Sequence, residues 1–216
     1  MRKKSVQFAL DKKGRKIVVI NQILFYGKKK LPWNEVEKYL KCYIGKIIEV
    51  AETKELIHIA SDFPDEYKGS EDTKKTHGAY AKAKANAVQG VEEMVKISRK
   101  TSETPNYKDK NKNKAKYGWH RYLSRFALPV VSEDNLIRYY NIYLATLVVR
   151  KTKNGKLYLY DIVNIKKEDS IELLWVVTLL SSETSEISTT RYAGARCMLY
   201  KKITFPFIMR LFKPKL

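Results

Sequence analysis

The sequence predicts an α+β fold, in which a small N-terminal hairpin-helix unit is followed by a helix packed on an antiparallel sheet meander. Three observations predict it: apolar alternation near the start, an Ala-rich stretch in the middle, and three later runs rich in Val, Ile and Tyr. The chain has 216 residues, of which 44% are hydrophobic, so it can build a core. We expect an N-terminal αβ unit over residues 1–62, a second domain over 63–168 and a basic tail over 169–216.

The first unit is predicted as two hairpins around a helix. Residues 6–25 alternate and then become β-branched on either side of a turn at 11–15. Pro32 and Gly45 mark the start and end of a helical pattern. A second hairpin is expected within 47–59, where two apolar runs flank a polar turn.

The middle of the chain alternates between polar and helical segments. Residues 61–67 are acidic and aromatic and are expected to form an irregular loop. The Ala-rich stretch has high helix propensity, and we expect one helix from 78 to 97. Residues 101–116 are rich in Lys and Asn and predict a loop or a mobile linker that carries basic charge.

Three strands of a meander are predicted at 119–131, 136–150 and 157–165. Polar turns at 132–135 and 151–155 separate them. Beyond residue 168 the pattern is ambiguous, because residues 171–180 fit either a helix or a strand.

The charge of the chain indicates a polyanionic partner. Lys and Arg number 43 against 23 Asp and Glu, for a net charge of +20. Nucleic acid is the first candidate for such a partner and an anionic membrane surface the second. Nine basic and two acidic residues lie between Arg99 and Arg125, and no acid follows Glu186. The tail after Arg191 alternates basic and apolar residues, which suits either an interfacial segment or a simple docking tail.

The location predicted from the sequence is cytoplasmic. The longest apolar stretch, 173–180, is too short to span a bilayer, and no signal-peptide pattern opens the chain. The two cysteines, Cys42 and Cys197, lie far apart and have no metal-ligand spacing, which favours reduced thiols.

Common enzyme signatures are absent from the sequence. It contains no Walker loop, GxGxxG, HExxH or GxSxG motif. His58, His77 and His120 are too scattered to suggest a metal site, and the acidic residues between 62 and 72 fit a solvated loop better than a magnesium cage. We therefore expect neither a metal ion nor a cofactor.

Basic and aromatic side chains remain as the candidates for chemistry. Metal-free cleavage of RNA needs a base for the 2′-hydroxyl, cations for the pentavalent phosphate and an acid for the leaving oxygen, and Arg, Lys and Tyr can fill these roles. Single-stranded RNA also binds aromatic faces beside cations. In a strand His120 and Tyr122 share one face while Trp119 and Arg121 share the other, so they do not all line one groove unless a bulge intervenes.

Several of these residues also have structural interpretations. Lys82 and Lys84 fit the wet side of an amphipathic helix, and Tyr158 and Tyr160 fit the core or its rim. Asp161 is expected either to orient an Arg or to cap a local turn.

Five segments in one order resemble a domain of large polyvalent proteins of phages and conjugative elements, which is assigned to the barnase, EndoU, colicin and RelE-like ribonuclease superfamily. They are residues 47–59 with 61–67, residues 81–87, residues 118–122, residues 125–130 and residues 157–162. The resemblance covers about Lys16 to Lys167. It implies a barnase/RelE-like arrangement of a helical part on an antiparallel sheet, and metal-independent cleavage of RNA.

The resemblance carries catalytic roles onto five residues of this chain. These are Lys84, Arg121, Arg125, Tyr158 and Tyr160. The arginines would hold the scissile phosphate, Lys84 would stabilise developing charge, and a tyrosine would transfer a proton. The expected RNA-binding residues are Lys82, Lys112, Lys114, Lys116, Trp119, His120, Tyr122 and Arg150.

The resulting prediction is a metal-independent endoribonuclease or RNA-processing protein of a phage, plasmid or conjugative element. The alternative is a non-catalytic protein that binds RNA or a ribonucleoprotein complex as an anti-defence factor, comparable to an anti-CRISPR protein. For either function, we expect RNA binding to weaken steeply as the salt concentration rises.

Overall fold

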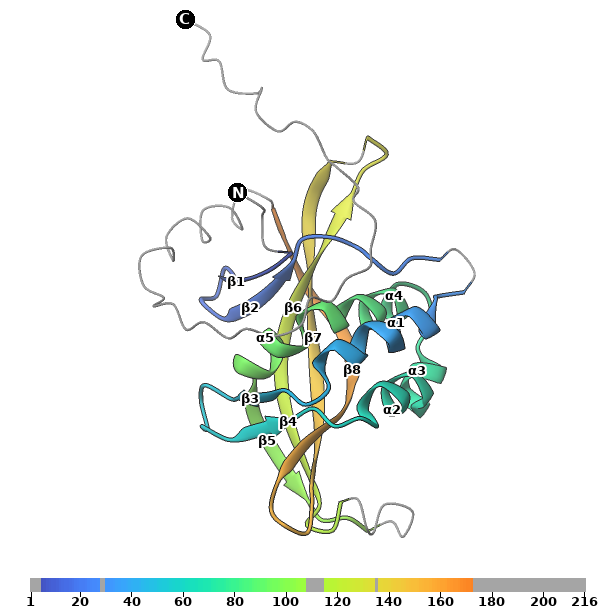
Figure 1. The fold of residues 1–216 in the computed structure, drawn as a ribbon. Coiled ribbons are helices and arrows are strands. Elements are labelled where there is room, and N and C mark those ends of the chain that lie inside the picture. Colours follow the sequence, from blue (N-terminus) through green and yellow to red (C-terminus); the bar gives the residue numbers. More distant parts are fainter. Residues whose placement is uncertain (1–4, 28–29, 108–114, 135, 173–216) are drawn as a thin grey trace, which may run out of the picture.

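The computed structural model describes residues 5–27, 30–107, 115–134 and 136–172. These residues form an α+β fold with a curled mixed sheet of eight strands and several short helices (Figure 1). The predicted tail residues 173–216 lie outside the described part of the chain.

The meander predicted from the sequence forms the middle of the sheet. Its strands are β6 (Trp119–Val131), β7 (Ile137–Lys151) and β8 (Leu157–Glu172), and each pairs antiparallel with the next. They are the long strands that cross the middle of Figure 1. Strand β8 runs through residue 168, so the boundary expected there falls inside a strand.

The two N-terminal hairpins are confirmed, and they extend the sheet at opposite sides. The first consists of β1 (Val6–Leu10) and β2 (Lys16–Ile20), and the second of β3 (Ile47–Glu49) and β4 (Leu56–His58). Strand β2 runs parallel to β6 and β4 runs parallel to β8, which gives the order β1-β2-β6-β7-β8-β4-β3. Residues of the predicted units 1–62 and 63–168 therefore share one sheet.

The helices gather beside the meander in Figure 1. Helix α1 (Trp33–Leu40) continues into the 3-10 turn η1 (Lys41–Tyr43) near Gly45, which has a positive φ of 86°. The segment expected as an irregular acidic loop contains helix α2 (Phe63–Gly69), with Pro64 in its first turn, and α3 (Glu71–Lys75) follows. Proline is compatible with a first helical turn because its missing N–H would have no intrahelical acceptor there.

The long helix expected over 78–97 is divided into three parts. They are α4 (Gly78–Ala87), the 3-10 turn η2 (Val88–Gly90) and α5 (Val91–Lys96). A Cβ at Gly90 would come within 2.9 Å of a methyl carbon of Val18 in β2. The helical segment is therefore interrupted where its backbone packs closely against the sheet.

Part of the polar segment expected as a linker is a strand. Strand β5 (Arg99–Thr104) pairs antiparallel with the first half of β6, on the edge that β2 uses further along. Its side chains are mostly exposed, so the segment lacks the apolar alternation that would identify a strand in the sequence. Backbone hydrogen bonds with β6 make this segment a strand, although its side-chain pattern does not indicate one.

Most of the core lies between the helices and the sheet. Phe63 and Tyr67 of α2, Val88 and Met94 pack in one cluster with Tyr122 and other residues of the strands. A smaller cluster around Ile142 contains residues from β1, β2, β6, β7 and β8. None of the helices in the described ranges combines the length and the apolarity that a membrane span needs.

Candidate functional site

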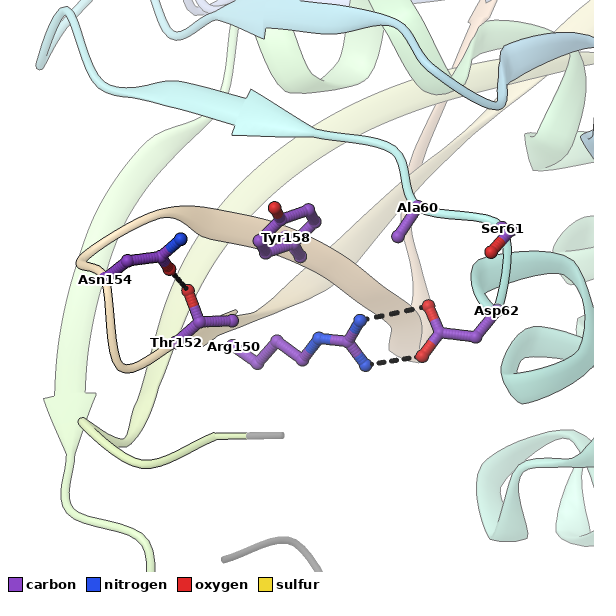
Figure 2. A pocket seen from close by; sticks show the side chains of 7 residues that line it. All are labelled: Ala60, Ser61, Asp62, Arg150, Thr152, Asn154 and Tyr158. Atoms are coloured by element: carbon purple, nitrogen blue, oxygen red, sulfur yellow. Dashed lines mark hydrogen bonds and ion pairs between the residues drawn. The ribbon is translucent and has the colours of Figure 1, made fainter. Parts of the chain in front are cut away.

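An open pocket of about 610 Å³ lies where β7 turns into β8, against the loop that follows β4. Figure 2 shows its lining. The lining residues are Ala60, Ser61, Asp62, Arg150, Thr152, Asn154 and Tyr158. They combine hydroxyl, amide, carboxylate and guanidinium groups with one aromatic ring. We call this the Arg150 pocket.

A row of rings and one guanidinium crosses four strands at this pocket. Trp119 of β6 lies opposite Arg150 of β7, which in turn lies opposite Tyr158 of β8. Tyr158 is paired with His58 of β4, and their ring centroids are 5.2 Å apart. Directly paired residues share one face of a sheet, so these four side chains form a continuous row.

Arg150 is held by two partners. Its guanidinium carbon lies 5.5 Å from the centroid of the Tyr158 ring, and Nη1 and Nη2 donate to the carboxylate of Asp62 over 2.7 and 3.0 Å (Figure 2). Two parallel hydrogen bonds fix the plane of a guanidinium. The plane of Arg150 is therefore set before any ligand arrives.

The turn beside the pocket is also well ordered by its own contacts. The Thr152 hydroxyl donates to the side-chain oxygen of Asn154 over 2.6 Å, and Gly155 has a φ of 76°. Residues 151–156 contain three lysines and no acid. The polar rim of the Arg150 pocket therefore lies next to positive charge.

Tyr160 lies on the same strand face as Tyr158, next to Trp119. The Tyr160 and Trp119 ring centroids are 5.0 Å apart, and the Tyr160 hydroxyl donates to Oε2 of Glu66 in α2 over 2.8 Å. Burial, together with the bond to Glu66, raises the pKa of Tyr160 well above its usual value. The phenol therefore remains protonated at neutral pH and is a poor general base.

Basic side chains surround a second hollow, of about 340 Å³, at the edge formed by β2, β5 and β6. Its lining includes four cations, Lys16, Lys96, Arg99 and Arg125, and one acid, Glu52. Arg125 also pairs with Glu168 over 2.7 Å, and Lys96 pairs with Glu92 over 2.8 Å. This basic hollow is suited to a polyanion, because Lys and Arg side chains neutralise phosphate groups when they bind them.

Lys84, predicted as a catalytic cation, lies in the interior. Its side chain is 0% exposed, and Nζ lies 2.7 Å from Asp72 and 3.1 Å from Asp161. The ammonium also lies 5.0 Å from the centroid of the Tyr67 ring. These contacts join α3, α4 and β8, so we assign Lys84 a structural role instead of a catalytic one.

The other predicted catalytic residues are distributed along the sheet. Arg121 donates to the Thr104 hydroxyl of β5 over 3.0 Å, and Arg125 belongs to the basic hollow. Because a strand rises about 3.3 Å per residue, Arg125 lies roughly 20 Å along β6 from Trp119. The structure brings Tyr158 and Tyr160 together with Trp119 and Arg150, but it places neither Lys84 nor Arg125 beside them.

Strand alternation separates the predicted RNA-binding residues of β6. His120 is 2% exposed and Tyr122 is 0% exposed, and both lie on the face of β6 opposite Trp119. A ligand on the face that carries Trp119 would not reach these two buried side chains. Lys82 and Lys116 are exposed, whereas Lys112 and Lys114 lie outside the described residues.

Sequence reasoning missed several residues of the pocket. Asp62 appeared only as one acid of a loop, and Thr152 and Asn154 only as a turn. The Thr-x-Asn-Gly pattern was a usable signal for an ordered turn. Nothing in the sequence pairs Asp62 with Arg150, because 88 positions separate them.

Comparisons with known proteins found no match. No protein-family model matches the chain, no curated protein sequence matches it, and no solved structure matches it.

Proposed function

We propose that this protein binds single-stranded RNA, with a base seated in the Arg150 pocket. The observation that carries the proposal is the row of Trp119, Arg150, Tyr158 and His58 across one sheet face, next to an open pocket. Proteins that bind single-stranded RNA without sequence preference stack its bases on aromatic rings and on guanidinium planes. A fixed guanidinium on a tyrosine ring is such a platform.

The polar groups of the pocket suit a nucleobase and its ribose. Ser61, Thr152 and Asn154 provide donors and acceptors around the Tyr158 ring. Ligand pockets of about 300–1,000 Å³ are typical for small molecules, and the Arg150 pocket lies in that range.

The basic hollow provides a track for the phosphate backbone. Its four cations outnumber its single acid, and Arg99 at its rim is exposed. Binding of single strands depends on salt with a slope of about −0.7 per neutralised phosphate. Contact of all four cations with phosphate would contribute a slope of roughly −3.

Cleavage of RNA remains a prediction from the resemblance, as do the barnase/RelE-like arrangement, the mobile-element origin and a ribonucleoprotein partner. The expected catalytic set is dispersed, because Lys84 is engaged inside the protein and Arg125 lies far along β6. Tyr160 is hydrogen-bonded to Glu66 and remains protonated. These contacts favour binding over cleavage.

The test is fluorescence anisotropy with a labelled 12-nucleotide single-stranded RNA in EDTA, across a series of salt concentrations. Tyr158→Ala should weaken binding by roughly 1–3 kcal/mol, the value of one stacked base. Arg99→Gln should flatten the salt slope by about 0.7 for the phosphate contact it removes. Tyr139→Ala, at an exposed tyrosine near the other end of the meander, is the matched control and should change neither quantity.

Two outcomes would change the assignment. If Tyr158→Ala binds the RNA as tightly as the unmodified chain, the pocket is not the base site. If the labelled RNA is cut in EDTA to 2′,3′-cyclic or 3′-phosphate ends, and Tyr160→Phe abolishes the cutting, the ribonuclease prediction replaces the binding proposal.

A further inference from the structure

A second group of ionisable side chains lies on the opposite face of β6. Glu55 precedes β4, Glu103 belongs to β5, and His120 belongs to β6 directly opposite Glu103. One donor atom from each residue lies within 4.8 Å of the other two. Among the described residues, this is the only such group of three His, Cys, Asp or Glu side chains.

His120 is the unusual member of the group. Its side chain is 3% exposed, and within the described part of the chain its Nδ1 atom has no hydrogen-bond partner. Nδ1 lies 3.9 Å from Oε1 of Glu55, and Nε2 lies 3.7 Å from Oε2 of Glu103. Both distances exceed a hydrogen bond, so a buried imidazole points at two carboxylates without bonding to either.

One nitrogen of His120 and one oxygen from each carboxylate lie close enough to approach a single metal ion. Zn²⁺ binds His nitrogen and carboxylate oxygen at about 2.0–2.2 Å in tetrahedral geometry, which places neighbouring ligand atoms roughly 3.3–3.6 Å apart. An imidazole binds one metal ion through a single nitrogen, and one atom of each residue lies within 4.8 Å of the other two. The donors would therefore have to approach one another by about 1 Å, and Glu103, 56% exposed, has room to move.

A neighbouring hydroxyl orients one of the carboxylates. The Tyr122 hydroxyl donates to Oε2 of Glu55 over 2.7 Å. Outer-shell partners of metal ligands orient them in this way.

A cation already occupies the space between the two carboxylates. Nζ of Lys100 lies 2.5 Å from Oε1 of Glu55 and 2.5 Å from Oε1 of Glu103. The Lys100 side chain is 22% exposed and has a flexible stem, so its ammonium can move away when a metal ion binds.

We propose that Glu55, Glu103 and His120 form a binding site for Zn²⁺ or a similar divalent transition metal, from which the ammonium of Lys100 is displaced. Three protein ligands leave one coordination position for water. The metal would join the turn before β4 and the edge strand β5 to β6, on the face of β6 opposite Trp119.

The test uses the tag-free full chain, stripped with a chelator and then dialysed. Zn²⁺ is titrated by calorimetry, and Co²⁺ by visible absorption, which reports coordination number and ligand type. We expect one equivalent of either metal and a Co²⁺ spectrum of low coordination number without a thiolate charge-transfer band.

Three variants locate the site. Lys100→Gln removes the competing ammonium and should tighten Zn²⁺ binding at least tenfold. Glu103→Gln, at an exposed position that the fold tolerates, should weaken it at least tenfold, and His120→Gln should do the same. Glu71→Gln, at a glutamate of α3 whose side chain is 74% exposed, is the matched control and should leave affinity unchanged.

The proposal fails if neither the unmodified chain nor Lys100→Gln binds one equivalent of Zn²⁺ or Co²⁺. It also fails if Glu103→Gln binds as tightly as the control, or if the Co²⁺ spectrum shows cysteine ligands. In either of those cases the metal lies elsewhere on the chain.

Discussion

Lys84 and Arg150 are both buried basic residues that pair with aspartates, yet their partners differ in burial. The Lys84 side chain is 0% exposed and its partner Asp161 is 4% exposed. The Arg150 side chain is 9% exposed, but it lines an open pocket and pairs with an Asp62 side chain that is 31% exposed. The same pairing chemistry therefore lies inside the fold in one place and lines a pocket in the other. Burial of Asp161, more than the identity of the cation, separates the two environments.

The largest effect that this comparison predicts is on stability. Lys84→Met leaves the buried Asp161 without its cation, and breaking a buried pair in this way costs about 3–5 kcal/mol of the free energy of unfolding. Lys82→Met, at an exposed position on the same helix, should change that free energy by less than about 0.5 kcal/mol. Urea denaturation followed by circular dichroism measures both.

If Lys84→Met unfolds at the same urea concentration as the unmodified chain, the enclosed Lys84 pair does not stabilise the fold. If it also lost RNA cleavage or binding while remaining stable, Lys84 would belong to the functional site and the catalytic prediction would return.

Arg150→Met should affect RNA binding more than stability. It removes the guanidinium from the stacked row, and the loss of one such platform is worth roughly 1–3 kcal/mol of binding free energy. The Asp62 carboxylate that it leaves behind is partly exposed, so the stability cost should be smaller than for Lys84→Met. Arg138→Met, an exposed arginine on the same strand, is the control in anisotropy and urea experiments.

The buried pair of Lys84 and Asp161 should also make stability depend on pH. Burial raises the pKa of Asp161 to about 6. The folded state therefore holds the Asp161 proton more tightly than the unfolded chain, whose pKa is about 3.9. The stabilisation from this group is complete below about pH 4 and is lost as the pH rises towards 6.

The measurement is the difference in free energy of unfolding between the unmodified chain and Asp161→Asn. Relative to Asp161→Asn, the free energy of unfolding of the unmodified chain should fall as the pH increases from about 4 to 6. A flat profile for Asp161→Asn would contradict the environment described for the buried pair.

The smallest effect concerns Tyr160, which lies beside the Arg150 pocket. Tyr160→Phe removes the hydrogen bond to Glu66 and should cost about 1 kcal/mol of stability. Its ring remains against Trp119, so RNA affinity should change less than twofold. A large loss of affinity without a loss of stability would show that the hydroxyl contacts the ligand.

Local patterns in the sequence were sufficient for much of the fold. The meander, both N-terminal hairpins and the opposite faces of Trp119 and His120 follow from period-2 alternation and turn residues, which neighbouring residues determine. The helix α2 was missed because its acidic and aromatic residues resemble a loop. Strand β5 was missed because its polar side chains lack alternation.

By itself, the sequence determined the α+β class, the order of the main strands and the concentration of positive charge, because these depend on composition and on short-range periodicity. Only the tertiary structure decided that the N-terminal hairpins join opposite sides of the meander, that Lys84 is enclosed and that Arg150 lines a pocket. Sheet pairing and burial depend on contacts between residues far apart in the chain. The same Lys or Arg can therefore support the core or bind a ligand, according to which distant carboxylate the fold places beside it and how much water remains around the pair.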